Sequence, residues 1–313
     1  MEKMKNSEMK VKKDSLKAWI LAARPKTLTA AAVPVMIGLT LAWKDAKGFQ
    51  TADGSEVFNW TAAVLCLLFA FIMQIDANFI NDFVDYAKGT DDRDTRLGPE
   101  RACAQGWVSI ERMKHAIAIT TCLACLVGLP LIIYGGLEMV LVGLLCVVFC
   151  FFYTTHLSYM GLGDILVLVF FGLIPVCITY YIQLPQTMTI EVVLGALACG
   201  LVIDALLLIN NFRDRDTDRI AGKKTLVVRI GPKAAIGCYL GVGVAASLMG
   251  LVYGLNGHWW AFVLPFVYLL LHLLTFLKMY RIWEGRELNK CLGDTARNIL
   301  IYGIMVTAGL LLS

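Results

Sequence analysis

The sequence predicts an all-α membrane protein in which about nine transmembrane helices form one bundle. Hydrophobic residues make up 58% of the 313 residues and charged residues only 17%, whereas charged residues are about a quarter of a soluble domain. Apolar runs of about 20 residues, long enough to cross a bilayer, recur along the chain. Basic residues gather in alternate connections between these runs. The composition excludes a soluble globular domain, and no nucleic-acid partner is expected.

Nine apolar runs are the expected helices. The first extends from about Trp19 to Trp43, contains Arg24 near its start, and is expected to include a half-buried segment there. This run is too long for the core of a signal peptide, so we expect no cleaved leader. The other eight are Trp60 to Ile80, His115 to Tyr134, Leu137 to Tyr153, Leu162 to Ile182, Ile190 to Ile209, Ala234 to Leu255, Trp259 to Tyr280, and Asn298 to Leu312.

The distribution of basic residues predicts how the chain crosses the membrane. Residues 1–17 are polar and rich in lysine, which predicts a basic cytoplasmic tail before a single transmembrane domain at 18–313. With this tail inside, every Lys and Arg except Lys44 and Lys47 falls on the cytoplasmic side. The positive-inside rule predicts such a bias. We therefore expect the C-terminus on the outer side.

A row of oxygen-bearing side chains marks the end of the sixth run. Asn210, Asp214 and Asp218 are spaced four residues apart, and each step of four advances only about 40° around a helix. Their side chains therefore point the same way if the helix continues. Charged groups in membrane helices are costly to hold, so this row predicts a site for hard cations.

A second row marks the end of the second run. Asn78, Asp82 and Asp85 share one helical face there. Asp91 lies beyond Gly89, where the helical phase is lost, and is retained as a further metal ligand without a fixed place in the row. Both rows fall on the predicted cytoplasmic side and each leads into a basic, Gly-containing loop, which suggests two half-sites related by an ancient duplication.

Basic residues accompany both acidic rows. They are Lys88, Arg93, Arg96 and Arg101 in the first half-site, and Arg213, Arg215, Lys223 and Lys224 in the second. Carboxylates interleaved with Arg and Lys suit Mg²⁺ bridged to phosphate oxygens, because Mg²⁺ keeps few protein ligands and Arg makes two-pronged contacts. A diphosphate is the predicted guest, and a site at the membrane boundary predicts a long hydrocarbon on the rest of it.

A prenyl diphosphate fits this description, and its chemistry follows. Metal ions and basic residues stabilise the charge that builds on the departing diphosphate, leaving an allylic cation that an electron-rich carbon can attack. No protein nucleophile is needed, and a water-poor cavity keeps the cation from being hydrolysed.

Short motifs along most of the chain carry a family resemblance. They are Arg24-Pro25-Lys26-Thr27-Leu28, Asn81-Asp82 with Asp85, Lys88-Gly89 and Asp91, Arg96-Leu97-Gly98-Pro99, Gly161-Leu162-Gly163-Asp164 with Phe170-Phe171-Gly172, Asn210-Asn211 with Arg213-Asp214, Asp218 and Gly222-Lys223, and Thr225 to Gly231. Together they resemble the motifs of the UbiA superfamily of intramembrane prenyltransferases, and most closely those of its 1,4-dihydroxy-2-naphthoate polyprenyltransferases.

The resemblance implies a nine-helix bundle around a central cavity, in the bacterial cytoplasmic membrane, with a cytoplasmic active site. It implies two Mg²⁺ ions, an all-trans polyprenyl diphosphate as donor, and 1,4-dihydroxy-2-naphthoate as acceptor. The reaction would release diphosphate and CO₂ and form demethylmenaquinol. The isoprenoid chain length is left open.

Carried over by position, the resemblance also implies roles for individual residues. Metal and diphosphate would be held by Asn78, Asp82, Asp85, Asn210, Asp214 and Asp218. Arg213 and Lys223 would contact the phosphates, with Lys223 counted among the catalytic groups, and Arg24 and Lys26 would bind either diphosphate or the acceptor carboxylate. The further expected substrate contacts are Asn81, Lys88, Arg96, Tyr153, Asp164 and Asn211.

The chain departs from the family pattern in two places. Where the wider superfamily often has a third Asp in the first motif, this chain has Gly89, with Asp91 as the nearby substitute. The segment from Tyr153 to Tyr159 is shorter than its family counterpart and lacks a Pro, which leaves the loop beside the acceptor unassigned.

Several alternatives remain open at this point. Another aromatic acceptor, such as 4-hydroxybenzoate or a porphyrin, would use the same donor chemistry, and a cation-coupled transporter would also place acids in membrane helices. Asp164 is either a helix cap or a substrate contact. Asp204, in the middle of an apolar run, either lines the cavity or is a buried hydrogen-bonded acid, and His156 is a further candidate for the acceptor.

Overall fold

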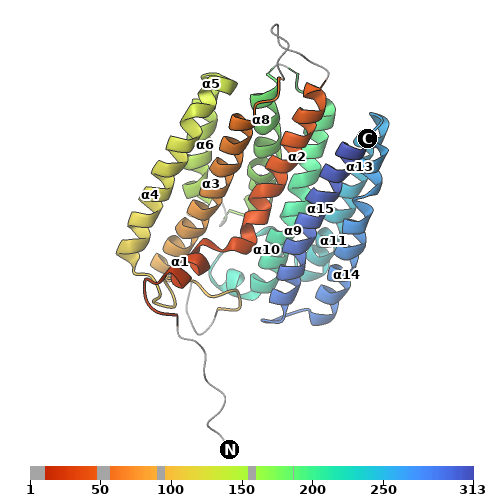
Figure 1. Ribbon diagram of the computed structural model, residues 1–313. Coiled ribbons are helices and arrows are strands. Elements are labelled where there is room, and N and C mark those ends of the chain that lie inside the picture. Colours follow the sequence, from red (N-terminus) through yellow and green to blue (C-terminus); the bar gives the residue numbers. More distant parts are fainter. Residues whose placement is uncertain (1–10, 48–56, 90–95, 154–159, 186) are drawn as a thin grey trace, which may run out of the picture.

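The computed structural model describes residues 11–47, 57–89, 96–153, 160–185 and 187–313, and every regular element among them is a helix. Figure 1 shows the helices side by side as one bundle. The elements are α1 (Leu16–Ala23), η1 (Pro25–Thr27), α2 (Leu28–Ala46), α3 (Trp60–Ala87), α4 (Ile110–Gly128), η2 (Leu129–Leu131), α5 (Ile132–Gly135), α6 (Glu138–Phe152), α7 (Gly163–Val167), η4 (Leu168–Leu173), α8 (Ile174–Gln183), α9 (Ile190–Ile220), α10 (Leu226–Ile230), α11 (Pro232–Met249), α12 (Leu251–Leu255), α13 (Trp259–Val263), α14 (Phe266–Ile282) and α15 (Leu288–Leu312).

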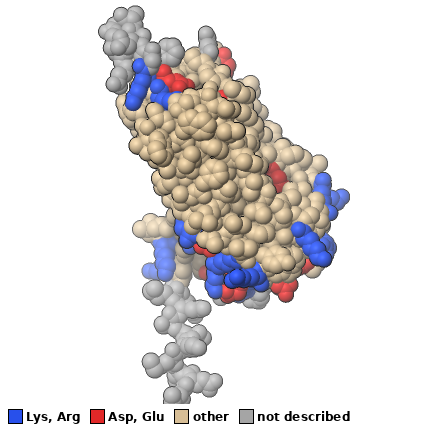
Figure 2. All heavy atoms as spheres, turned by 90° about the vertical axis from the view of Figure 1, so that its right-hand side faces the viewer, with Lys and Arg blue, Asp and Glu red and all other residues tan. Residues whose placement is uncertain are grey.

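The prediction of about nine membrane helices is confirmed. Among the described residues, eight helical stretches are long and apolar enough to cross a membrane, and the 15-residue α6 is a shorter apolar helix beside them. On the face that Figure 2 shows, charged side chains gather at the two ends of the molecule and a broad, largely uncharged band lies between them. The chain is a multi-pass membrane protein.

The first apolar run, expected as one helix with a half-buried segment around Arg24, is divided in two at that residue. Arg24 adopts a left-handed backbone conformation with φ 51°, and Pro25 follows it. Such a φ is unusual for a residue other than Gly, and Pro lacks the N–H that a continuing helix needs. The short α1 therefore ends here, and α2 begins in a new direction after η1 (Figure 1).

Two long helices carry the acidic rows past the ends of their apolar runs. The Asn59 side chain caps α3 by accepting a hydrogen bond from the amide of Ala62 at 2.9 Å, and this helix continues to Ala87. The Thr189 side chain caps α9 in the same way, and α9 continues to Ile220. Both helices are longer than the apolar runs that predict them, because helical hydrogen bonds satisfy the backbone beyond the membrane core as well as within it.

The long helix α9 lies in the middle of the bundle. It packs against α2, α7, α8, α10, α11, α15 and η4. Contact with η4, a stretch of π-helix, is unusually close: a Cβ placed on Gly172 would lie 2.6 Å from the carbonyl oxygen of Ala196 and 2.8 Å from the Cα of Gly200. Small residues four positions apart commonly let membrane helices approach this closely.

The ends of α3 and α9 that carry the acidic rows lie at one end of the bundle, the end where α1 lies (Figure 1). The C-terminal end of α15 lies at the opposite end. The helix α15 starts at Leu288, well before the predicted start at Asn298, because polar residues at its beginning bind the connecting segments described below.

Candidate active site

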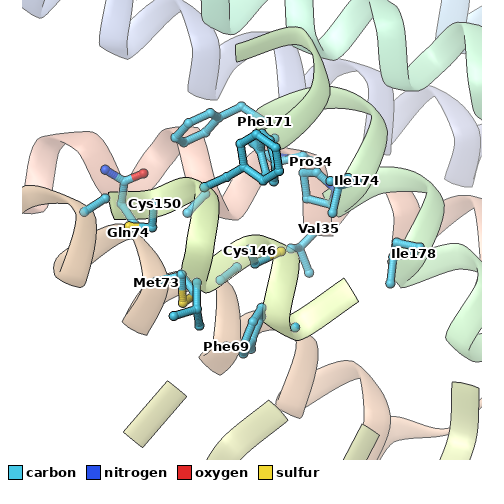
Figure 3. Close-up of a pocket in the computed structure, with 18 of the residues that line it drawn as sticks. Pro34, Val35, Phe69, Met73, Gln74, Cys146, Cys150, Phe171, Ile174 and Ile178 are labelled. Atoms are coloured by element: carbon cyan, nitrogen blue, oxygen red, sulfur yellow. The ribbon is translucent and has the colours of Figure 1, made fainter. Parts of the chain in front are cut away.

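Two adjoining cavities open between the helices. The apolar chamber has a volume of about 580 Å³ and is walled by α2, α3, α4, α6, α8, α9 and η4. Figure 3 shows Phe69, Met73 and Gln74 from α3 facing Cys146 and Cys150 from α6, with Pro34, Val35, Phe171, Ile174 and Ile178 closing the other sides. The polar chamber has a volume of about 300 Å³ and collects the ends of α3 and α9 with the segment around Arg96.

The two chambers share part of their walls. The residues common to both are Arg24, Thr27, Asn81, Tyr153, Leu207 and Asn210. These residues form the junction of one amphipathic cavity, in which a charged head at one end can remain attached to an apolar tail at the other.

From the first motif, Asn81 and Asp85 line the polar chamber. They lie four residues apart, so they point the same way from α3. Asp85 is held by Arg101, whose Nη2 lies 3.0 Å from the Asp85 Oδ2, and both side chains are largely buried. Arg101 comes from the segment between α3 and α4 and belongs to the chamber wall.

Asp82, which the spacing places in the metal-binding row, has a different position. Its side chain is fully buried, lines neither chamber, and accepts hydrogen bonds from the amides of Ala102 at 2.8 Å and Cys103 at 3.1 Å. Asp82 therefore anchors the segment that carries Arg101. The row that faces the polar chamber is Asn81 with Asp85, because residues 81 and 82 are about 100° apart on the helix.

Asn78 lies one turn deeper and lines the apolar chamber. Its Nδ2 donates to the carbonyl oxygen of Ala23 and to Thr27 Oγ1, both at 2.9 Å. These bonds tie α3 to the break between α1 and α2. They also leave Asn78 at the cavity wall rather than among the carboxylates.

From the second motif, Asn210, Asn211, Asp214 and Asp218 all line the polar chamber, in agreement with the spacing of the row along α9. Asp214 is bound by both ends of the Arg213 guanidinium, at 2.8 and 2.6 Å. Asp218 lies 3.6 Å from Lys223 Nζ. Each carboxylate of the two motifs that faces the chamber thus has a basic partner beside it.

A connecting segment closes the polar chamber from the side of α15. Asn289, near the start of α15, accepts from Arg213 at 2.8 Å and donates to the carbonyl oxygen of Leu97, also at 2.8 Å. A Cβ on Gly98 would lie 2.7 Å from the Arg213 guanidinium, so Gly at this position lets the segment lie against that cation. Burial, and then the nearby Arg101, lowers the pKa of Arg96 to about 10, which leaves its guanidinium protonated at neutral pH.

The donor set of the polar chamber suits a hard cation. Asp85, Asp214 and Asp218 offer carboxylate oxygens, and Asn81 and Asn210 offer amide oxygens, which are the ligand types that Mg²⁺ prefers. No three acidic, His or Cys side chains among the described residues converge closely enough to hold an ion by themselves. A cation here would complete its coordination with amide oxygens, water or substrate oxygens, as Mg²⁺ commonly does with water and phosphates.

Besides Asp82, two predicted site residues lie outside both chambers. Lys26 and Lys88 are exposed and line neither chamber. Lys26 belongs to η1, whose chamber-facing residue is Thr27, and Lys88 directly follows the last residue of α3. Asp91 and the loop residues 154–159, including His156, lie outside the described residues. Arg24, Arg96, Tyr153, Asp164, Arg213 and Lys223 line the polar chamber, and their roles toward a substrate stay predictions.

The two further acidic candidates, Asp164 and Asp204, differ in their position relative to the chambers. Asp164 lines the polar chamber, where its Oδ1 has no partner among the described residues. Asp204 is buried, lines neither chamber, and has an Oδ1 that likewise finds no partner in the described part of the chain. Asp76, by contrast, bonds to Thr120 and Thr121 of α4 and joins two helices.

Two residues that belong to the site or support it are not predicted from the sequence. Asn289 supports the site by accepting a hydrogen bond from Arg213. Gln74 is a buried polar residue within an otherwise apolar stretch of α3 and lines the apolar chamber. An uncharged amide within an apolar run gives only a weak signal in the sequence.

The fold and the site together define a class of protein. An amphipathic cavity lies inside a bundle of membrane helices, and its charged end carries two facing sets of carboxylates with Arg and Lys beside them. This is the arrangement of a membrane enzyme that acts on a lipid with a charged head.

Comparison with known proteins identifies the family. The model of the UbiA prenyltransferase family matches residues 27–300, so the chain belongs to this family, and the transporter alternative is set aside. It is 36% identical to a 1,4-dihydroxy-2-naphthoate octaprenyltransferase of Escherichia coli K12 over 79% of this chain and 80% of that one. It is 34% identical to the protein of that name in Haemophilus influenzae, over 96% and 97% of the two chains.

Solved structures share the fold. A UbiA homologue from Aeropyrum pernix K1 superposes with a TM-score of 0.65 at 15% identity, over 91% of this chain and 97% of that one. A UbiA homologue from Archaeoglobus fulgidus bound to DMAPP and Mg²⁺ superposes with a TM-score of 0.56 at 16% identity, over 93% and 99% of the two chains.

Proposed function

We propose that the protein transfers a polyprenyl group from an all-trans polyprenyl diphosphate to 1,4-dihydroxy-2-naphthoate, releasing diphosphate and CO₂ and forming demethylmenaquinol. The observation that carries the proposal is the amphipathic cavity, whose polar and apolar chambers meet at Arg24, Asn81 and Asn210. The names of the relatives in Escherichia coli and Haemophilus influenzae support the choice of acceptor.

The donor fits the cavity in one direction. Its diphosphate lies in the polar chamber among Arg96, Arg101 and Arg213, and its hydrocarbon chain lies in the apolar chamber. The reverse placement would bury the charged diphosphate against apolar side chains, which is costly. The prenyl C1 atom, which joins head and tail, then lies at the junction.

Magnesium fits the donor set, and Asn81, Asp85, Asn210, Asp214 and Asp218 would hold it, with two ions expected, one for each motif. Bound Mg²⁺ would neutralise negative charge on the diphosphate. Arg213 turns from Asp214 to the phosphates and Lys223 turns from Asp218, so that both cations are placed where charge develops on the leaving group.

The transfer itself uses no protein nucleophile. The bond between prenyl C1 and the diphosphate oxygen breaks, and its electron pair leaves with the diphosphate. The ring carbon that bears the carboxylate supplies the electron pair of the new carbon–carbon bond. The bond from that carbon to the carboxylate then breaks, and its electron pair returns to the ring as CO₂ leaves. Apolar walls at the junction, including Leu207, exclude water that would otherwise capture the allylic cation.

We further propose that the site lies on the cytoplasmic side of the bacterial cytoplasmic membrane, with the C-terminus outside. The described Lys and Arg residues other than Lys44 and Lys47 support this orientation, because they lie in the helix ends and connections on the side of the polar chamber.

The proposal is tested by incubating the purified protein with farnesyl diphosphate, either 1,4-dihydroxy-2-naphthoate or 4-hydroxybenzoate, and either Mg²⁺ or EDTA. A Mg²⁺-dependent prenylated naphthalenediol without its carboxyl group, identified by mass, is the expected product. Product with hydroxybenzoate alone would keep the site and overturn the acceptor. A folded protein that yields neither product would contradict the proposal.

A further inference from the structure

We infer that Gln74 binds a hydroxyl group of the aromatic acceptor and thereby makes the enzyme select acceptors that carry it. The inference rests on the proposed function and deepens it. Gln74 lies on α3 at the wall of the apolar chamber, where its neighbours include Met73 and Cys150 (Figure 3). Its side chain is buried, with 8% exposed.

One end of the Gln74 amide is fixed. Its Nε2 donates to Thr27 Oγ1 at 3.3 Å, and Asn78 Nδ2 donates to the same oxygen at 2.9 Å. Thr27 Oγ1 itself donates to the carbonyl oxygen of Arg24 at 2.9 Å. A hydroxyl has one hydrogen to donate and two lone pairs to accept with, so all three capacities of Thr27 are used. The Gln74 amide cannot turn over without losing its bond to Thr27.

The other end of the amide has no protein partner. Gln74 Oε1 is buried and accepts no hydrogen bond from any described residue. Buried polar atoms are nearly always bonded, and leaving one unbonded is unfavourable. Figure 3 shows the amide at the edge of the chamber with its oxygen on the cavity side. This is where a donor from a bound substrate would satisfy it.

The chemistry of an amide oxygen decides which substrate this is. Such an oxygen accepts hydrogen bonds and donates none, so it binds neither a diphosphate nor a carboxylate. The prenyl diphosphate offers no donor in its ionised form, since its head carries acceptor oxygens and its tail is hydrocarbon. A dihydroxynaphthoate offers two hydroxyl donors. The aromatic substrate, rather than the prenyl diphosphate, is therefore the one that donates a hydrogen bond to Gln74.

Arg24 completes the acceptor site. It lines both chambers at the junction, and its Nη2 is buried without a hydrogen-bond partner among the described residues. Thr27 contacts both residues, through the backbone carbonyl oxygen of Arg24 and the side-chain amide of Gln74, and all three residues line the apolar chamber. A cation for a carboxylate and an acceptor oxygen for a hydroxyl therefore belong to neighbouring residues of one wall. A hydroxylated aromatic acid satisfies both.

The test compares ligands and side chains together. Binding of 1,4-dihydroxy-2-naphthoate, 1-hydroxy-2-naphthoate and 4-hydroxy-2-naphthoate is measured by calorimetry on the purified wild-type protein and on Gln74→Leu, alongside steady-state transfer with Mg²⁺. Wild type should bind the dihydroxy acid about tenfold more tightly than one of the two analogues, the effect of one buried hydrogen bond. In Gln74→Leu this preference should vanish, while the KM for prenyl diphosphate changes less than about twofold.

Two further variants separate binding from stability. Gln74→Met keeps the length of the side chain and should lose the preference as Gln74→Leu does. Gln183→Leu makes the same change at a buried Gln outside both chambers, whose amide bonds to the backbone of Asn59 at 2.8 and 2.9 Å. Gln183→Leu should lower the thermal stability of the protein and keep the preference.

Two results would overturn the inference. Wild-type turnover of the dihydroxy acid, with an undiminished preference in folded Gln74→Leu and Gln74→Met, would refute the role of Gln74 and leave the proposed function standing. Folded wild type that binds and prenylates none of the three naphthoates would refute the proposed function, and the inference with it.

Discussion

Replacing Asp82 by Ala should loosen one connecting segment without removing a metal ligand. The two amide hydrogen bonds that Asp82 accepts, at 2.8 and 3.1 Å, are bonds to a charged group, each worth about 1.5 to 3 kcal/mol. Their loss should make opening of the segment at residues 101–108 about 3 to 6 kcal/mol easier. Asp82→Asn keeps one acceptor oxygen and should show about half of this effect.

Hydrogen exchange measured by mass spectrometry tests this directly. The amides of Ala102 and Cys103 should exchange much faster in Asp82→Ala than in wild type, and thermal unfolding should begin at a lower temperature. Activity should fall as well, because the same segment carries Arg101 to Asp85. The Mg²⁺ concentration at half-maximal activity should stay unchanged, since Asp82 lines neither chamber.

The matched comparison is Asp85→Ala, which removes a carboxylate that does line the polar chamber. This variant should raise the Mg²⁺ concentration at half-maximal activity about tenfold or more, and the amide hydrogen of Ala102 should exchange at close to the wild-type rate. The reasoning is refuted by the opposite pattern: an Asp82→Ala protein with wild-type exchange and a raised Mg²⁺ requirement. Asp82 would then be a ligand, as its spacing first suggests.

Three further predictions follow from the structure. Burial and the Asp82 carboxylate raise the pKa of Cys103 to about 12, so at pH 8 only about one thiol in 10⁴ is ionised. Alkylation of Cys103, measured by mass spectrometry, should therefore be slow in wild type and faster in Asp82→Ala. Equal alkylation rates in the two proteins would contradict the anchoring role of Asp82. Gly172→Ala should destabilise the protein by about 1 to 3 kcal/mol by forcing η4 from α9. Gly237→Ala lies within α11 and its Cβ meets nothing in the described residues within 4 Å, so this variant should unfold at or above the wild-type temperature, because Ala favours a helix more than Gly does; equal unfolding temperatures for the two variants would remove the packing argument. Mg²⁺ alone should raise the unfolding temperature little, because no three acids of the described residues converge on one ion. Mg²⁺ together with a non-hydrolysable prenyl diphosphate analogue should raise it much more. An equally large rise with Mg²⁺ alone would contradict a shared metal–diphosphate site.

The fold follows closely from the sequence. Long apolar runs separated by basic connections predict a helical membrane bundle, and the break at Arg24 is visible in the residue types, since a charge followed by Pro interrupts an apolar run. The row on α9 is also predictable, because Asn210, Asp214 and Asp218 share one spacing, and the partners of the two carboxylates, Arg213 and Lys223, line the same chamber. Helix ends are less predictable, as the early start of α15 at Leu288 shows.

The row on α3 shows where spacing is insufficient. Asn78, Asn81, Asp82 and Asp85 allow two overlapping rows, and both have helical spacing. What separates them is the partner of Asp82, a pair of backbone amides about twenty residues further along the chain, which no pattern of side chains reveals. The role of Gln74 is not predictable from the sequence for a related reason. An uncharged amide inside an apolar run gives a weak signal, and its importance follows only from the unpaired oxygen beside a cavity in the structure.

The pairing of each chamber-facing motif carboxylate with a cation has a consequence for the whole catalytic cycle. Asp85 with Arg101, Asp214 with Arg213, and Asp218 with Lys223 make the empty chamber close to electrically balanced. If a metal diphosphate binds as proposed, the cations would exchange carboxylate for phosphate and the carboxylates would exchange their cations for the metal. The total charge of the chamber would then change little on binding. Loading should therefore require little net charge to cross into the low-dielectric bundle, and product release should restore the internal pairs.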